Sequence, residues 1–350
     1  MSGIIITEPE VHCRVDNAPP PEWGPYVVHH AESTIYHDPR WATLMRDVYG
    51  NACFFLTAWR GCRCVGVLAL VLQRSWMMGS RLCSLPYLDA SGVLADDESA
   101  SAALLVEAGR LMVDRHTKWI EIRQERPLPG DLPTRRDKLT MRLTLPAGSA
   151  VLMDSFRGKT RNQIRKALSL GMSVDMGGPE RLADFHHVYT RTMRDLGSPP
   201  HSHEFFRRLM EAFGPAASVF VIRDGNHLVA AALVLEDARR VYVPWSGSDW
   251  RHGNGQANTM LFWSMLSACS ERGVKGFDFG RSTRGSGTHV FKQKWSAAEV
   301  PLHWHYVFRS GQSTPRTHHG PVLKLAGACW RKLPLHTVRV LGPRIIRKVS

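Results

Sequence analysis

Short apolar runs of strand length alternate along the chain with segments in which apolar residues recur at three- and four-residue spacing. This pattern predicts, in chain order, a helix at 39–48, strands at 53–59, 65–72 and 80–85, a helix at 98–115, and strands at 118–123 and 139–145. The turn at Arg60-Gly61 makes the first two strands a hairpin. Helices mixed with strands in this order indicate an α/β (α+β) fold.

The second half repeats the same order. Residues 219–236 align with 54–73 when Gly225 is placed on Gly61, at an offset of 164 residues. A later helix and strand, within 261–279, align with their first-half counterparts at an offset of 157 residues. A tandem duplication of one α/β unit explains both offsets.

The domain boundary is predicted at Pro146-Ala147-Gly148-Ser149, where turn residues follow the last strand of the first unit. We therefore expect a first domain at 1–150, a second domain at 151–310 and a basic segment at 311–350. Each domain is expected to be a mixed, twisted sheet flanked by helices.

The second half also carries a basic segment that the first half lacks. Residues 154–170 predict a helix that begins at Asp154 or Ser155, ends at Gly171, and buries Phe156, Ile164 and Leu168. Its cations are Arg157, Lys159, Arg161, Arg165 and Lys166. No acid follows the cap, so these cations have no local ion pairs and repel one another, which favours a negatively charged partner. Helices at 180–196 and 203–213 follow.

The overall charge is also basic. The chain has 45 Lys and Arg against 31 Asp and Glu, a formal net charge of +14. This balance indicates RNA, anionic lipid headgroups or a phosphorylated ligand as a partner. The last residues, 300–350, contain nine Lys or Arg and no acid. They could lie on a membrane surface, bind RNA or pack on the body, and Pro334 and Pro343 argue against one long helix.

Several classes of protein are excluded. The longest apolar run, 65–72, is far shorter than the roughly 20 residues of a membrane span, and the first residues do not resemble a signal peptide. Seven scattered cysteines fit reduced thiols in a cytoplasm. The histidines lack metal-ligand spacing, so we expect no metal and a cytoplasmic protein, with a possible peripheral contact at the inner membrane face.

The stretch from Asp249 to Trp295 holds the candidate site. It predicts a Gly/Asn-rich loop, a helix, a strand at 274–279, and a glycine-rich turn that leads to Phe291, Lys292 and Lys294. Backbone N–H groups ahead of the helix could bind an anion.

Three segments of this half resemble the FemAB-like members of the GNAT acyltransferase superfamily, especially the subgroup associated with exosortase and PEP-CTERM exopolysaccharide systems, with a BioF2-like acetyltransferase domain. They are FRGKTRNQIRKALSLGM from Phe156, NTMLFWSMLSACSERGVKGFDFGRS from Asn258, and GTHVFKQKWSAAEVPLHWHYV from Gly287. The loop LPYLDASGVLADD in the first half and LGPRIIR in the tail are similar too. The sequence departs from the family pattern at two places. Ser91-Gly92 stands where the family's first-domain loop usually has a double glycine, and Asn254 and Gln256 break the GNAT pyrophosphate-binding pattern.

The resemblance implies two tandem GNAT-like domains and transfer of an aminoacyl or acyl group to an amine, from aminoacyl-tRNA or acyl-CoA as co-substrate. It implies no tightly bound cofactor. A Phe-Lys pair in the family positions the acyl carbonyl and stabilises developing charge; the matching residues are Phe291 and Lys292. The amine acceptor is expected to be lipid- or nucleotide-linked, in envelope or exopolysaccharide biosynthesis.

Amine attack on an ester or thioester produces an oxyanion, for which Lys292 is the candidate donor. The amine must lose a proton, so His289 is the candidate base. Asp278 is the alternative base, but the sequence equally allows it to cap the backbone or to pair with Arg281. The expected substrate-binding residues are Arg157, Lys159, Arg161, Arg165, Lys166, Trp245 and Lys294, with Trp250 and Tyr242 as further groove residues. Two other functions remain open: an acyl-CoA-dependent N-acetyltransferase of a small molecule, and a non-catalytic RNA- or membrane-binding adaptor. No role with DNA is expected.

Overall fold

The computed structural model describes residues 10–75, 79–249, 251–252, 255–309 and 321–349. The chain forms two compact units, each with its own sheet. The first unit contains residues 1–135 and 303–314, and the second contains 136–302 and 315–350.

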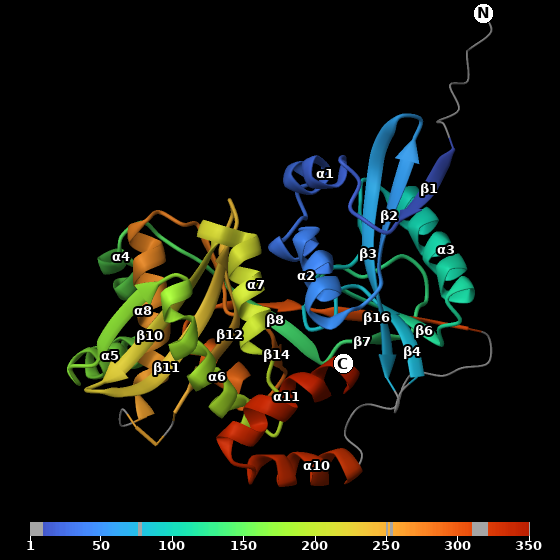
Figure 1. Ribbon diagram of the computed structural model, residues 1–350. Coiled ribbons are helices and arrows are strands. Elements are labelled where there is room, and N and C mark those ends of the chain that lie inside the picture. Colours follow the sequence, from blue (N-terminus) through green and yellow to red (C-terminus); the bar gives the residue numbers. More distant parts are fainter. Residues whose placement is uncertain (1–9, 76–78, 250, 253–254, 310–320, 350) are drawn as a thin grey trace, which may run out of the picture. The chain divides into compact units, whose positions relative to one another are not determined.

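The first sheet has the strand order β1-β2-β3-β4-β6-β16-β7, with β5 paired to β3. Its strands are β1 (Val11–Asp16), β2 (Cys53–Arg60), β3 (Arg63–Ser75), β4 (Gly79–Cys83), β5 (Leu94–Ala95), β6 (Trp119–Gln124), β7 (Thr134–Arg135) and β16 (His303–Phe308). All pairs are antiparallel except β4 with β6. The helices are α1 (Trp23–His29), the 3-10 turn Ile35–His37, α2 (Arg40–Tyr49) and α3 (Glu98–Asp114). In Figure 1, α3 covers one face of the sheet, and α1 and α2 lie at the other.

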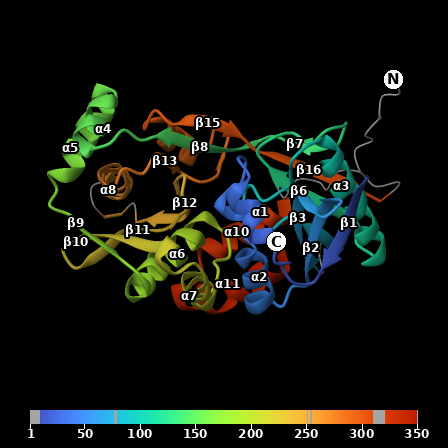
Figure 2. The same ribbon diagram turned by 90° about the horizontal axis from the view of Figure 1, so that it is seen from above.

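The second sheet has the order β14-β8-β13-β12-β11-β10-β9, with β15 paired to β8. Its strands are β8 (Lys138–Thr144), β9 (Ser173–Gly177), β10 (Ala217–Asp224), β11 (His227–Glu236), β12 (Val241–Ser248), β13 (Gly276–Asp278), β14 (Ser282–Thr283) and β15 (Ala298–Pro301). Its α-helices are α4 (Ser149–Ser155), α5 (Gly158–Leu168), α6 (Leu182–Leu196), α7 (His203–Phe213), α8 (Ala257–Glu271), α9 (Gly287–Gln293), α10 (Pro321–Arg331) and α11 (Leu335–Val349). Figure 2 shows α6 and α7 on one side of the sheet and α8 on the other.

The two sheets have the same plan, as the repeat predicts. Both contain an antiparallel hairpin whose turn glycine has a positive φ, +61° at Gly61 and +55° at Gly225. The strand register shifts after Ala58 in one hairpin and after Ile222 in the other, at the same 164-residue offset. Both sheets also contain one parallel pair joined through a helix. The predicted α/β fold with two similar domains is therefore confirmed.

One predicted strand belongs to the other sheet. The strand at 139–145 was expected to close the first unit, but β8 pairs with β13, β14 and β15 of the second sheet. In its place β16, from the far end of the second domain, pairs with β6 and β7. The alternation of apolar residues identifies a strand but carries no information about which sheet edge it joins.

The predicted basic helix at 154–170 is two helices. α4 ends at Ser155, and Phe156 and Arg157 are extended, with ψ angles of 153° and 149°. Phe156 is buried between the helices, whereas Leu168, expected in the core, is 45% exposed. The side chain of Phe156 reaches the core because the backbone leaves the helical path there.

The tail forms two helices, α10 and α11, on either side of Pro334. Pro343, in contrast, lies inside α11. The preceding Gly342 has no Cβ to clash with the proline ring, which removes part of the steric cost of placing a proline inside a helix. Every helix in the described part of the chain is too short or too polar to cross a bilayer.

Candidate active site

The parallel strands β12 and β13 separate early. Their last paired residues are Tyr242 and Asp278, but β12 continues to Ser248. The chain leaves β13 at Gly280, which has a φ of +74° and where a Cβ would lie 2.4 Å from the carbonyl oxygen of Val243. Only glycine fits this close approach. Ligands of α/β sheets bind beyond the carboxyl ends of parallel strands, so the residues after β13 are candidates for the site.

Lys292 is directed at the end of β13. Its Nζ donates to the carbonyl oxygens of Gly280 at 2.7 Å and Arg281 at 3.0 Å, and the side chain is buried. The predicted glycine-rich turn leads into α9, whose N-cap is Ser286; the Ser286 hydroxyl accepts the N–H of His289. The helix holds Lys292 at a fixed position, with its cation against two carbonyl groups.

Phe291 points to the core. Its ring centroid lies 5.3 Å from that of Phe262 on α8 and 6.2 Å from that of Trp295. The Nζ of Lys294 lies 5.5 Å from the centroid of the Phe291 ring. Phe291 therefore joins α9 to α8 and leaves the polar contacts to its neighbour Lys292.

His289 is buried and both its ring nitrogens have partners. Nδ1 accepts the N–H of Gly285 at 3.0 Å, so Nε2 carries the proton and donates to Glu299 on β15 at 2.8 Å. The hydrogen bond from His289, together with those from Arg284 and Gln293, lowers the pKa of Glu299. With Nδ1 already an acceptor, this geometry favours a positioning role for His289 over that of a base.

Asp278, the alternative base, is buried and accepts hydrogen bonds from a hydroxyl, an arginine and a backbone N–H. It accepts from Thr140 at 2.5 Å, from Arg142 at 2.9 Å and from the N–H of Gly280 at 2.8 Å. The hydrogen bond from Gly280 is a backbone cap, one of the two expected roles. The arginine that pairs with Asp278 is Arg142 on β8, the strand that the sequence placed in the other domain. Asp278 thus fixes β8 and Gly280 to β13.

The basic helix α5 is fastened to α9. The hydroxyl of Thr160 donates to the carbonyl oxygen of Lys294 at 2.8 Å. Four of the predicted cations are exposed: Arg157, Lys159, Arg165 and Lys166. Arg161 is half-buried and donates to the carbonyl oxygen of Phe156 at 2.7 Å, so it closes the break between α4 and α5. The structure therefore brings α5 together with Lys294.

Trp245 lies apart from these residues. Its ring packs against His201, Phe205 and Phe206, with centroids 5.9, 5.7 and 5.2 Å away. Burial lowers the pKa of His201 to about 3, so this cluster is apolar and neutral. Tyr242 is fully buried, and Trp250 lies outside the described residues.

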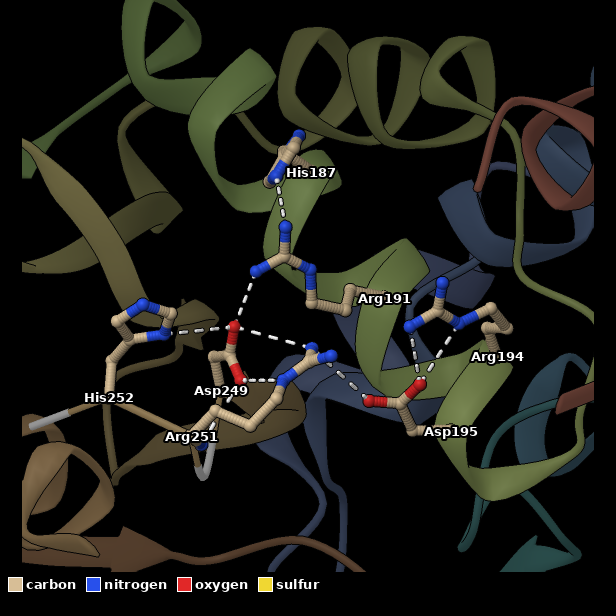
Figure 3. A network of polar contacts seen from close by, with 7 residues as sticks. All are labelled: His187, Arg191, Arg194, Asp195, Asp249, Arg251 and His252. Atoms are coloured by element: carbon tan, nitrogen blue, oxygen red, sulfur yellow. Dashed lines mark hydrogen bonds and ion pairs between the residues drawn. The ribbon is translucent and has the colours of Figure 1, made fainter. Parts of the chain in front are cut away.

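A polar network that the sequence did not predict lies where β12 ends (Figure 3). Buried Asp249 accepts from Arg191 of α6 at 2.5 Å and from Arg251 at 2.8 Å, and Arg251 also lies 3.8 Å from Asp195. Burial raises the pKa of Asp249, but the hydrogen bonds from Arg251 and Arg191 hold it below its ordinary value. Arg251 lies in the loop whose backbone the sequence offered as an anion site, and its own charge is paired with Asp249 and Asp195. One feature of the sequence could have identified this network: Asp249 directly follows a strand and stands two residues before Arg251.

Among the residues that the structure describes, no group of three or more His, Cys, Asp or Glu side chains could hold a metal ion.

Residues 154–293 match the family model of the acetyltransferase (GNAT) domain. The chain therefore carries a GNAT-type acetyltransferase domain in its second half. The matched segment includes α5 at one end and Lys292 at the other. A comparison with curated proteins found no match.

The chain is also similar to solved structures over most of its length. FemX has a TM-score of 0.65 at 14% identity, covering 84% of this chain and 97% of that one. L-PGS from Bacillus licheniformis has a TM-score of 0.58 at 14% identity, covering 89% and 98%. The tandem GNAT protein from the clavulanic acid biosynthesis pathway has a TM-score of 0.54 at 11% identity, covering 87% and 100%. These likenesses show a FemAB-like fold with two GNAT-like domains.

Proposed function

We propose that this chain transfers an aminoacyl or acyl group to an amine acceptor in cell-envelope or exopolysaccharide biosynthesis. The observation that carries the proposal is the buried ammonium of Lys292, held by two carbonyls where β13 ends. The FemAB-like fold supports it, since FemX and a structure described as the C-terminal domain of a putative lysylphosphatidylglycerol synthetase from Agrobacterium fabrum share that fold.

Lys292 would act on the charge that develops during transfer. The acceptor nitrogen forms a bond to the acyl carbon, and the carbonyl oxygen becomes an oxyanion until the bond to the leaving oxygen or sulfur breaks. The leaving oxygen or sulfur takes up the proton that the acceptor nitrogen loses. An ammonium has three N–H donors, and an oxyanion is a stronger acceptor than a backbone carbonyl. One donor can therefore turn from a carbonyl to the oxyanion, an interaction that contributes about 3 to 4 kcal/mol in comparable sites.

The donor would be bound through its phosphates. α5 presents four exposed cations and contains no acid, and its Thr160 contacts the residue that follows α9. Both aminoacyl-tRNA and acyl-CoA carry the phosphates that such a surface binds. The family description as an acetyltransferase favours acyl-CoA as the second candidate donor.

The test measures transfer from labelled aminoacyl-tRNA or labelled acetyl-CoA to a panel of nucleotide-linked and lipid-linked amines, with and without RNase. Lys292→Ala is expected to lower kcat by about 100- to 1,000-fold, as for loss of one oxyanion donor. Its matched control is Lys275→Ala, an exposed lysine directly before β13, which should retain activity.

Full activity of Lys292→Ala, with an unchanged thermal unfolding midpoint in both variants, would remove the proposed role. Salt-sensitive RNA binding without turnover from either donor would instead support the adaptor function.

A further inference from the structure

The two C-terminal helices are held on α6 by close backbone contacts. A Cβ on Gly197, at the end of α6, would lie 2.9 Å from the carbonyl oxygen of Gly327 in α10. A Cβ on Gly342 in α11 would lie 2.4 Å from the ring of Pro200. Both helices lie beside α6 in Figure 1. The tail therefore packs on the second unit, and its outer side is fixed in orientation.

The inner side of α11 is apolar. Val338, Gly342 and Ile346 are buried and recur every four residues, so they form the stripe that faces the body. On the outer side, Val340, Arg344 and Arg347 follow at helical spacing and are exposed. The helix thus has a second, exposed face that mixes an aliphatic residue with cations.

Large apolar side chains are exposed on both C-terminal helices. Val340 is 56% exposed and Leu341 is 38% exposed on α11, and Leu325 on α10 is 66% exposed. No acid occurs between residues 300 and 350. A face that only served solubility would mix both signs of charge and would not expose aliphatic side chains.

We infer that this outer face of α11, formed by Val340, Leu341, Arg344 and Arg347, docks on an anionic lipid bilayer. Interfacial helices place aliphatic side chains among the headgroups while Arg and Lys contact lipid phosphates. RNA would satisfy the arginines but gives the exposed leucine and valine side chains no apolar environment. A lipid surface contacts both the aliphatic side chains and the arginines. The inference holds for either acyl donor.

The test is sedimentation with vesicles of phosphatidylglycerol and phosphatidylcholine, compared with phosphatidylcholine alone. The wild-type chain should bind the anionic vesicles at about 0.1 M salt and be released at about 1 M, where screening acts within about 3 Å. Arg344→Glu/Arg347→Glu should weaken binding by tenfold or more, since each cation near an anionic surface contributes about fivefold.

Arg157→Glu/Lys159→Glu on α5 is the matched control, because it makes the same change of net charge on the other basic surface. It should bind vesicles nearly as well as the wild type. Val340→Asn, which leaves the charge unchanged, should also weaken vesicle binding. Transfer between water-soluble substrates should persist in Arg344→Glu/Arg347→Glu, so failure of membrane docking is distinguishable from failure of the transferase function.

Three outcomes overturn the inference: no preference for anionic vesicles, equal loss in the α5 control, or loss of tRNA binding without loss of vesicle binding in Arg344→Glu/Arg347→Glu. The last result would assign the face to RNA.

Discussion

Phe156 connects the basic helix to the core, so its removal should affect both stability and donor binding. The side chain is 2% exposed, and its ring centroid lies 5.6 Å from Trp295 and 6.5 Å from Trp263. Phe156→Ala should lower the free energy of unfolding by about 4 kcal/mol, because buried Phe→Ala changes cost about 3 to 5. Two large rings border the site and leave little room for it to collapse.

Urea denaturation followed by tryptophan fluorescence measures this loss, since two tryptophans border the substituted side chain. Val151→Ala on α4 is the control: Val151 is 58% exposed, so the change should stay within about 0.5 kcal/mol. In the transfer assay, Phe156→Ala should raise the KM for the donor more than it lowers kcat, because α5 loses its anchor while Lys292 keeps its carbonyl partners. A loss of stability below about 1 kcal/mol would refute the assignment of Phe156 as the anchor.

Two further substitutions test the region where β12 and β13 end. Asp249→Asn should lower the free energy of unfolding by roughly 2 kcal/mol at pH 7, less than for a fully buried pair because Arg251 is 43% exposed. Because the pKa of Asp249 is lowered in the native state, its carboxylate stabilises the fold fully only above the ordinary aspartate pKa of about 4. The free energies of unfolding of wild type and variant should therefore converge as the pH falls below that value. A difference between them that stays constant from pH 7 to pH 3 contradicts this. Gly280→Ala should unfold at lower urea concentration and transfer more slowly than Gly285→Ala, because both glycines have a positive φ, of +74° and +77°, but only the first abuts the backbone of β12. Equal effects of the two changes would show that the close approach is unimportant.

Local structure was predictable where one pattern decides it. The hairpins follow from strand-length apolar runs around a glycine turn, and α7 was predicted at its observed bounds, His203–Phe213. The exchange of β8 and β16 was not predictable, because period-two alternation is the same whichever sheet the strand joins. The break at Phe156 was also missed, since Phe156, Ile164 and Leu168 fit one helical stripe equally well.

The sequence names candidate site residues but does not give their contacts. Resemblance to a family pointed to Phe291 and Lys292, and spacing pointed to His289. Their partners come from distant segments: the carbonyl of Gly280 for Lys292, and Glu299 on β15 for His289. Such contacts depend on the path of the chain, which local spacing does not specify.

The exchange of β8 and β16 has a consequence for synthesis of the chain. The first sheet lacks β16 until residue 303 has left the ribosome, although the rest of that unit ends at Arg135. At roughly 5 to 20 residues per second, the nascent chain waits about ten to thirty seconds with the edge of β6 unpaired. During that interval an open edge can pair with other chains. Conversely, the second half made alone lacks β8, so a gene split at the duplication boundary would encode two halves that each miss a strand. Because each half supplies a strand to the sheet of the other half, the two halves must be encoded together in one gene.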